Sequence, residues 1–242
     1  MIRTLVLLVA LCNIAFMTFN TVIGPIGRVV GMPEWQIGFM MSVSGICWMM
    51  SSRSWGRHSD GVGRYRVMQQ GLIGFTVLFA LLSIAVALGL AKVIDAAMMF
   101  FSLLFTRGAL GAFYAALPVA SQAMIADSLA PEKRAGGLAA LGAASGVGMI
   151  LGPAIGGVLG AYSLILPLLF ATVLSAAAVL LVYKAGTSLK AVELEHRSGP
   201  RSSPPMSLTD RRLRWPMAVA LCAMFCVISA QVNTAFRLVP AL

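Results

Sequence analysis

Long apolar runs, separated by shorter polar stretches, follow one another along the whole sequence. The runs span approximately residues 4–23, 37–50, 67–90, 96–126, 135–159, 164–183 and 215–236. Most of them reach the roughly 20 residues that an α-helix needs to cross the hydrocarbon core of a bilayer. Because a helix pairs its backbone polar groups internally, it is the element that such runs form in lipid. The pattern therefore predicts an all-α integral membrane protein with seven transmembrane helices.

A polar segment interrupts this series between the sixth and the seventh run. Residues 184–214 are basic and rich in proline and serine, which is typical of a linker. We therefore predict three parts along the chain. Residues 1–183 form a six-helix transmembrane bundle, residues 184–214 a cytoplasmic linker, and residues 215–242 the first helix of an incomplete second bundle.

Composition and charge place the chain in a membrane and predict its orientation. Hydrophobic residues make up 59% of the sequence and charged residues 11%, and the mean hydropathy is +0.90, which excludes an ordinary soluble domain. The net charge of +10 comes from Lys and Arg residues at alternate ends of the runs, with only Arg28, Lys92 and Arg237 on the other side. This asymmetry follows the positive-inside rule and predicts a multi-pass protein with a cytoplasmic N terminus. It argues against nucleic acid as a partner, and our hypothesis for the membrane is a bacterial inner membrane.

A short segment between the second and third runs carries Gly56, Asp60, Gly63, Arg64 and Arg66. The glycines permit a tight turn, and the aspartate can pair with the arginines that follow it. This spacing resembles the signature loop of the major facilitator superfamily, although a glycine follows the aspartate where that family usually has a basic residue. The resemblance implies a cytoplasmic gate that closes against helices of a second bundle.

Two charged residues at the next cytoplasmic turn are candidates for the same gate. Asp127 and Arg134 flank the stretch that joins the fourth and fifth runs, and this stretch is similar to the corresponding one in many family members. An ion pair between Asp127 and a nearby arginine is one interpretation. Simple solvation of a helix end is the other, and the sequence does not choose between them.

Arg107 lies about eleven residues into the fourth run, which is roughly 16 Å along a helix and close to the middle of the membrane. A cation at that depth costs about 2.5–3.5 kcal/mol and is expected to face the bundle interior or an aqueous cavity. Tyr114 and Ser121 follow at seven-residue intervals, and Asn13 and Asn20 repeat this spacing in the first run. We predict that these residues line the substrate or proton pathway. The alternative is that the two asparagines bind only neighbouring backbone.

The segment that begins at Arg107 also resembles the helix-four motif of the superfamily. In that family the arginine is linked with proton transfer or with anionic substrates. None of the seven runs holds an Asp or Glu deep within it, so we expect any coupling acid to lie outside this bundle.

The fifth run carries small residues at a spacing that lets another helix approach closely. These are Gly148, Gly152, Gly156 and Gly157, with Pro153 among them to bend the helix. The string resembles the motif of the antiporter branch of the family, the drug and metabolite exporters, except that Ala139 replaces an upstream glycine. With three motifs in the family's order, the resemblance implies its fold, truncated relative to the usual twelve helices.

The resemblance implies transmembrane transport of a small organic molecule by alternating access, with proton-coupled efflux as the leading interpretation. Alternatives are import of an anionic metabolite, and an incomplete half-transporter with a binding, scaffolding or vestigial role. An enzyme is not expected, because His58 and His196 lie in polar segments and no catalytic pairing lies at membrane depth. No metal or other cofactor is predicted, since the four cysteines lie in apolar runs. The expected partners are the lipid bilayer, the substrate and protons, and transport would need the missing second bundle or a second copy.

Overall fold

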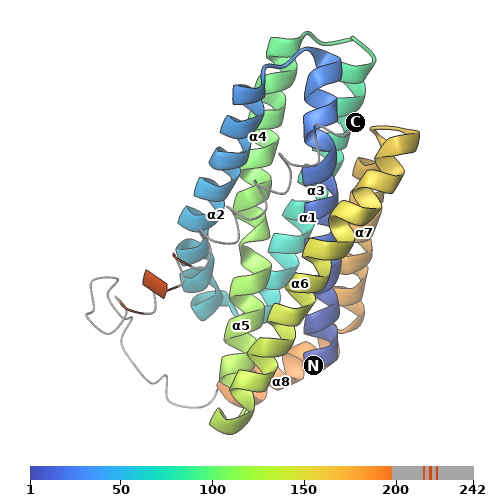
Figure 1. The fold of residues 1–242 in the computed structure, drawn as a ribbon. Coiled ribbons are helices and arrows are strands. Elements are labelled where there is room, and N and C mark those ends of the chain that lie inside the picture. Colours follow the sequence, from blue (N-terminus) through green and yellow to red (C-terminus); the bar gives the residue numbers. More distant parts are fainter. Residues whose placement is uncertain (198–214, 216–217, 220–221, 223–242) are drawn as a thin grey trace. The chain divides into compact units, whose positions relative to one another are not determined.

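The computed structural model describes residues 1–197 together with residues 215, 218, 219 and 222. The helices are α1 (Ile2–Val30), α2 (Glu34–Val62), α3 (Arg64–Leu90), α4 (Ala96–Tyr114), α5 (Ala116–Ser128), α6 (Pro131–Tyr162), α7 (Leu166–Lys184) and α8 (Gly186–Arg197). Met1–Ser198 is one compact unit (Figure 1). The predicted boundary at residue 183 falls inside this unit, because α8 packs back onto α3 and α5. Most of the predicted linker and of the seventh run lies outside the described residues.

Five helical segments in the described part of the chain are long and apolar enough to cross a membrane. They are Ile2–Val30, Arg64–Leu90, Ala96–Ser128, Pro131–Tyr162 and Leu166–Lys184. With 29 residues, α2 is as long as α1, but its serines, glycines and terminal charges make it less apolar. It nevertheless packs along α4 and α5 as part of the same bundle. The predicted all-α membrane class is confirmed, and α2 is the least apolar of its long helices.

The fourth predicted run forms two helices, α4 and α5, which meet at Ala115. Pro118 explains the break, because it has no N–H to donate to the carbonyl of Tyr114 and its ring crowds that carbonyl. Beside the break, Trp55 of α2 donates from Nε1 to the carbonyl of Ala112 at 2.8 Å. The indole therefore ties α2 to the bundle at the kink.

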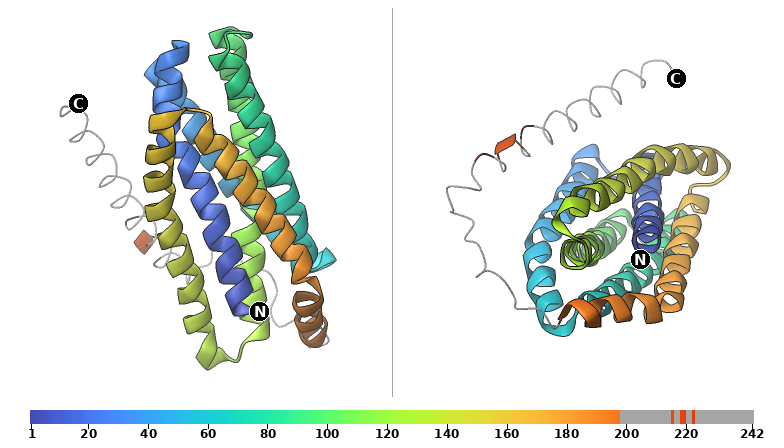
Figure 2. Two further views of the ribbon diagram at one scale, coloured as in Figure 1. Left: turned by 90° about the vertical axis from the view of Figure 1, so that its right-hand side faces the viewer. Right: turned by 90° about the horizontal axis from the view of Figure 1, so that it is seen from below.

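The bundle is built around α1, which packs against α6 and α7, while α2 packs on α4, and α3 on α4, α5 and α7 (Figure 2). Phe19, Phe75 and Phe79 are among the large side chains that fill its interior. The N terminus, the α2–α3 and α5–α6 turns and α8 all lie at one end (Figures 1 and 2). Among the described residues, the basic side chains that the sequence places at alternate helix ends therefore belong to segments at this end of the bundle, which we call the basic end.

Candidate functional site

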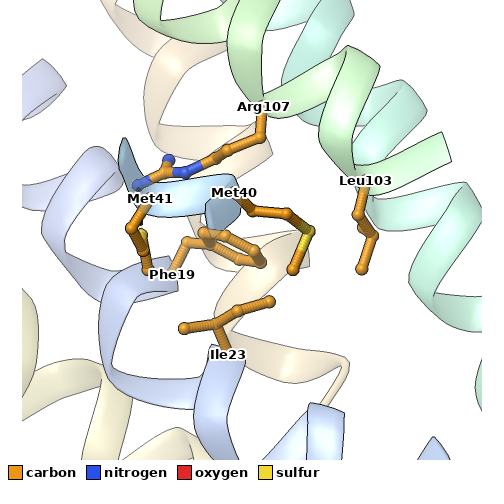
Figure 3. A pocket seen from close by; sticks show the side chains of 6 residues that line it. All are labelled: Phe19, Ile23, Met40, Met41, Leu103 and Arg107. Carbon is orange, nitrogen blue, oxygen red and sulfur yellow. Dashed lines mark hydrogen bonds between the residues drawn. The ribbon is translucent and has the colours of Figure 1, made fainter. Parts of the chain in front are cut away.

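Arg107 projects from the middle of α4 into the space between α1 and α2 (Figure 3). Its side chain is almost fully buried, with only 3% of its surface exposed. Nη2 donates to Oδ1 of Asn20 on α1 and, at 3.5 Å, to the sulfur of Met41 on α2. Nε and Nη1 have no hydrogen-bond partner among the described residues. The structure thus brings together two predicted pathway residues, Arg107 and Asn20, around an incompletely paired cation.

Aromatic rings surround this guanidinium. Its Cζ atom lies 4.4 Å from the ring centroid of Phe16 and 4.9 Å from that of Phe19, at distances where the ring face attracts a cation. Phe16 in turn stacks on Tyr114, with centroids 4.6 Å apart and planes at 11°. Tyr114 therefore joins the site through Phe16, and the three rings lie between α1 and α4.

The remaining wall of the site is apolar. Arg107 lines a small pocket together with Phe19, Ile23, Met40, Met41 and Leu103 (Figure 3). Sequence reasoning missed the α1 members of this wall, although a signal was present. One face of the first helix carries Phe16, Phe19, Asn20 and Ile23, which follow one another at the spacing of a helix face. The predicted pathway residue Asn20 therefore shares its face with three aromatic or aliphatic side chains.

Asn13 and Ser121, the other predicted pathway residues, lie elsewhere in the bundle. Asn13 donates to the carbonyl of Val9 at 3.2 Å and to the hydroxyl of Ser145 on α6 at 3.4 Å. Ser121 is fully buried and donates to the carbonyl of Leu117, one turn earlier in α5, at 2.7 Å. Both side chains are hydrogen-bonded within the bundle, and neither contacts Arg107 through a bond that the structure shows.

A second cluster of charges lies at the basic end. Arg64 pairs with Asp60 of α2 at 2.6 Å and with Asp127 of α5 at 3.1 Å, and it also donates to the hydroxyl of Ser59. One guanidinium thus links α2, α3 and α5. Of the other predicted gate residues, Arg134 donates to the carbonyl of Leu129 at 2.9 Å, and Arg66 is exposed on the first turn of α3.

The segment that carries these charges is mostly helical, whereas the sequence indicated a loop. The predicted turn is reduced to a single residue, Gly63, because α2 continues to Val62 and α3 begins at Arg64. Gly63 has a φ of +106°, which L-residues with a side chain rarely adopt. Gly56 lies inside α2, where a Cβ would make an ordinary 3.8 Å contact with Val119. The close turn therefore depends on Gly63 alone.

Glu193 of α8 completes the cluster and was missed by sequence reasoning. Its carboxylate accepts from the backbone N–H of Arg64 at 2.8 Å and from that of Tyr65 at 3.1 Å, two groups that have no partner inside α3. Lys190, one turn earlier, lies over the ring of Tyr65 at 5.2 Å. Glu193 is 129 positions from Arg64 in sequence, and it lies within a stretch whose composition is that of a linker. No local signal therefore identified it.

The glycines of α6 form the contact with α1. A Cβ on Gly152 would lie 2.5 Å from Cβ of Met17, and one on Gly156 would lie 2.6 Å from the carbonyl oxygen of Thr18. Gly148 similarly abuts Asn13. Thr18 donates to the carbonyl of Gly152 at 3.2 Å, next to Pro153. Gly157 faces open space, so it takes no part in this contact.

These features define the class of protein. It is a multi-pass helical membrane protein with a buried cation between its helices and an ion-pair cluster at one end. The sequence model described as Major Facilitator Superfamily matches residues 5–242. The chain therefore belongs to the major facilitator superfamily, a family of membrane transporters.

Several curated proteins are similar to the chain. The tetracycline resistance protein, class D, of Salmonella ordonez is 32% identical over 173 residues, which is 70% of this chain and 39% of that protein. Solute carrier family 67 member A1 of Homo sapiens is 31% identical over 64% of this chain and 35% of its own length. Solute carrier family 22 member 18 of Rattus norvegicus is 29% identical over 66% and 37%, respectively. The matched region thus spans less than two fifths of each relative.

Proposed function

We propose that this chain forms the N-terminal bundle of a transporter that exports a small organic molecule by alternating access, coupled to proton entry. The observation that carries this proposal is the nearly fully buried Arg107, held by Asn20 at mid-helix depth between α1, α2 and α4. A charge kept at such depth is typical of a substrate or ion pathway. The similarity to a tetracycline resistance protein supports export.

The charged cluster around Arg64 is the gate of the transporter in this proposal. Arg64 joins α2, α3 and α5 through two carboxylates, and these ion pairs favour one arrangement of the helix ends over another. Alternating access requires such a two-state element, since the site must be open to one side at a time. We propose that the cluster closes the cytoplasmic side, in a bacterial inner membrane, against a second six-helix bundle. Under this proposal the chain catalyses no chemical reaction.

Transport assays in everted membrane vesicles test this function, with tetracycline as the first probe. We expect energised vesicles that contain the product of the complete coding sequence to accumulate the probe, and a protonophore to abolish the accumulation. Arg107→Gln should reduce the rate at least tenfold. The matched control is Arg53→Gln, which removes an exposed arginine of α2 and should leave the rate unchanged. Equal loss in both variants, or movement of every tested solute only out of the everted vesicles, would contradict the proposal.

The second bundle is tested separately with purified protein. We expect the 242-residue chain, reconstituted as a monomer, to move no solute, because alternating access near the midplane needs two bundles that rock against each other. Solute flux from the reconstituted monomer would show that no second bundle is required.

A further inference from the structure

We propose that Ala115 is the centre of a hinge between α4 and α5, and that Trp55 is the positioning residue that holds α4 in place while α5 swings. This inference rests on the proposed function, because it describes how the cytoplasmic gate opens. The two helices follow one another along the bundle as one apolar span, Ala96–Ser128, and meet at Ala115 (Figure 1). Because α4 carries Arg107 and α5 carries Asp127, the hinge separates the candidate pathway from the gate.

The backbone hydrogen bonds of this span are weakest at the hinge. Pro118 has no N–H to donate to the carbonyl of Tyr114. The N–H of Ala115 donates to the carbonyl of Gly111, and that of Val119 donates to the carbonyl of Ala115, both at 3.3 Å, which is long for such a bond. Sharp bends in long helices usually lie at a proline for this reason. A bend at Ala115 therefore disrupts fewer strong hydrogen bonds than a bend within either helix.

Two glycines of α3 form the support on which the hinge turns. A side chain on Gly71 would overlap Ala116, the first residue of α5, and one on Gly74 would overlap the ring of Phe113 in α4. Since neither position carries a side chain, the backbone of α3 lies directly against both sides of the hinge. Without interlocking ridges from α3, this contact locates the pivot but resists a bend less than meshed side chains do.

Trp55 of α2 holds the α4 side of the hinge. Its Nε1 donates to the carbonyl of Ala112 at 2.8 Å, and its ring meets that of Phe113 edge to face, with centroids 5.7 Å apart. Both partners belong to the last turn of α4. An indole has a single N–H to donate, so this hydrogen bond is committed to α4.

The far end of α5 is held by the gate charges instead. Asp127, in the last turn of α5, pairs with Arg64 at 3.1 Å, and its side chain is 52% exposed. Ion pairs of this exposure are weak and exchange readily for water. Arg64 also pairs with Asp60, which follows Trp55 on α2. The helix α2 therefore holds this span at two points, and only the one at the end of α5 depends on the gate charges.

Distances between pairs of nitroxide labels, measured by double electron–electron resonance, test the hinge in the 242-residue chain in lipid nanodiscs. With the native cysteines replaced by serine, Val77→Cys on α3 is the reference for two exposed positions. Its distance to Phe105→Cys is the α4 distance, and its distance to Ala130→Cys, just beyond α5, is the α5 distance. The 13 residues of α5 span about 20 Å, so a bend of about 10° moves its end by about 3 Å. We expect Asp127→Asn, which breaks the ion pair, to change the α5 distance by about this amount and to leave the α4 distance unchanged.

Trp55→Phe tests the role of the indole N–H, because it keeps a ring and removes the donor. Combined with Asp127→Asn, it should change the α4 distance as well as the α5 distance. The matched control is Trp48→Phe, the same substitution at an exposed ring of α2, which should leave the α4 distance unchanged. If Asp127→Asn changes both distances equally or neither of them, the hinge is refuted. An α4 distance that is the same with and without Trp55 would refute its positioning role.

Pro118→Ala keeps the hinge testable if Trp55→Phe does not fold. Alanine restores the donor for the carbonyl of Tyr114 and favours a helix, so this variant is expected to be stable. In the Asp127→Asn background it should remove at least half of the change in the α5 distance, and an undiminished change would overturn the hinge. The proposed function fails separately from this inference. Hinge motion in a protein that moves no solute in vesicles would refute transport alone, and transport with an unchanged α5 distance would refute the hinge alone.

Discussion

At the scale of single residues, the guanidinium of Arg107 depends on Asn20 for its one strong hydrogen-bond acceptor in the described structure. Asn20→Ala removes that acceptor and leaves a third buried nitrogen with only a thioether beside it. Because hydrogen bonds to charged groups contribute about 1.5–3 kcal/mol, we expect a loss of stability of this size. The measurement is the midpoint of thermal unfolding of the purified chain in detergent.

Asn20→Asp is the matched control for this prediction. It keeps an oxygen at the same position and adds a negative charge, so the bond to Arg107 should be retained and strengthened. We expect its midpoint to equal or exceed that of the wild type. If Asn20→Ala unfolds at the wild-type temperature, Asn20 does not hold Arg107 in solution.

Residue patterns explain why part of this site was visible in the sequence and part was not. The depth of Arg107 follows from counting along an apolar run, and Asn20 follows from polarity on the same helix. Phe16 shares a helix face with Asn20, but Phe16 and Met41 have ordinary residue types for a membrane helix, so nothing links them to Arg107 before α1, α2 and α4 are packed together. Asn13 has the same type and spacing as Asn20, yet it bonds to Ser145 of α6, because spacing along one helix does not determine which neighbour faces it.

At the scale of helices, the contact between α1 and α6 depends on the absence of side chains at selected glycines. Gly152→Ala would place a methyl group 2.5 Å from Cβ of Met17 and 3.0 Å from the carbonyl oxygen of Ile14. Backbone must move to accept it, and overpacking of this kind costs about 1–3 kcal/mol. We expect a lower unfolding midpoint for Gly152→Ala.

Gly157→Ala provides the comparison on the same helix. Its new methyl group would meet nothing within 4 Å, and alanine favours a helix over glycine by about 1 kcal/mol. This variant should be as stable as the wild type or slightly more so. Similar losses in Gly152→Ala and Gly157→Ala would mean that both effects arise from helix propensity rather than from the contact with α1.

The docking of α8 gives a second prediction at this scale. Glu193→Ala removes the carboxylate that accepts from the first backbone N–H groups of α3, where a negative charge is also favoured by the helix dipole. We expect α8 to open more often, with hydrogen exchange of residues 186–197 rising about tenfold, or ~1.4 kcal/mol. Glu132→Ala removes an exposed glutamate from the first turn of α6 and should leave this exchange unchanged. Protection of α8 that survives Glu193→Ala would assign its docking to Leu189 and Lys190 instead.

The helices also show which elements the pattern of apolar residues could predict and which it could not. Each apolar run within the described residues became a helix, and Pro118 accounts for the one that is broken. α8 was not foreseen, because residues 186–197 are polar and their helix is held by distant partners. Leu189 is fully buried, and Glu193 and Lys190 contact the start of α3. Such tertiary contacts, made across more than a hundred residues, leave no mark on local composition.

At the scale of the whole molecule, the charges predict how the bundle sits in the membrane. Arg57, Arg64, Lys133 and Lys190 belong to segments at the basic end, together with the N terminus (Figure 1). Lys and Arg are retained on the cytoplasmic side during insertion, so we expect this end to face the cytoplasm. The α3–α4 connection lies at the opposite end (Figure 1) and should face outward.

Single cysteines at the two ends test this orientation in intact cells. In a background with the four native cysteines replaced by serine, Arg66→Cys marks the basic end and Val93→Cys marks the α3–α4 connection, since both positions are exposed. A membrane-impermeant maleimide should label Val93→Cys in intact cells, and Arg66→Cys only after permeabilisation. The reverse pattern would place the Arg64 cluster outside the cell. In that case the cluster would close the external side of the pathway, and the direction of coupling proposed above would have to be inverted.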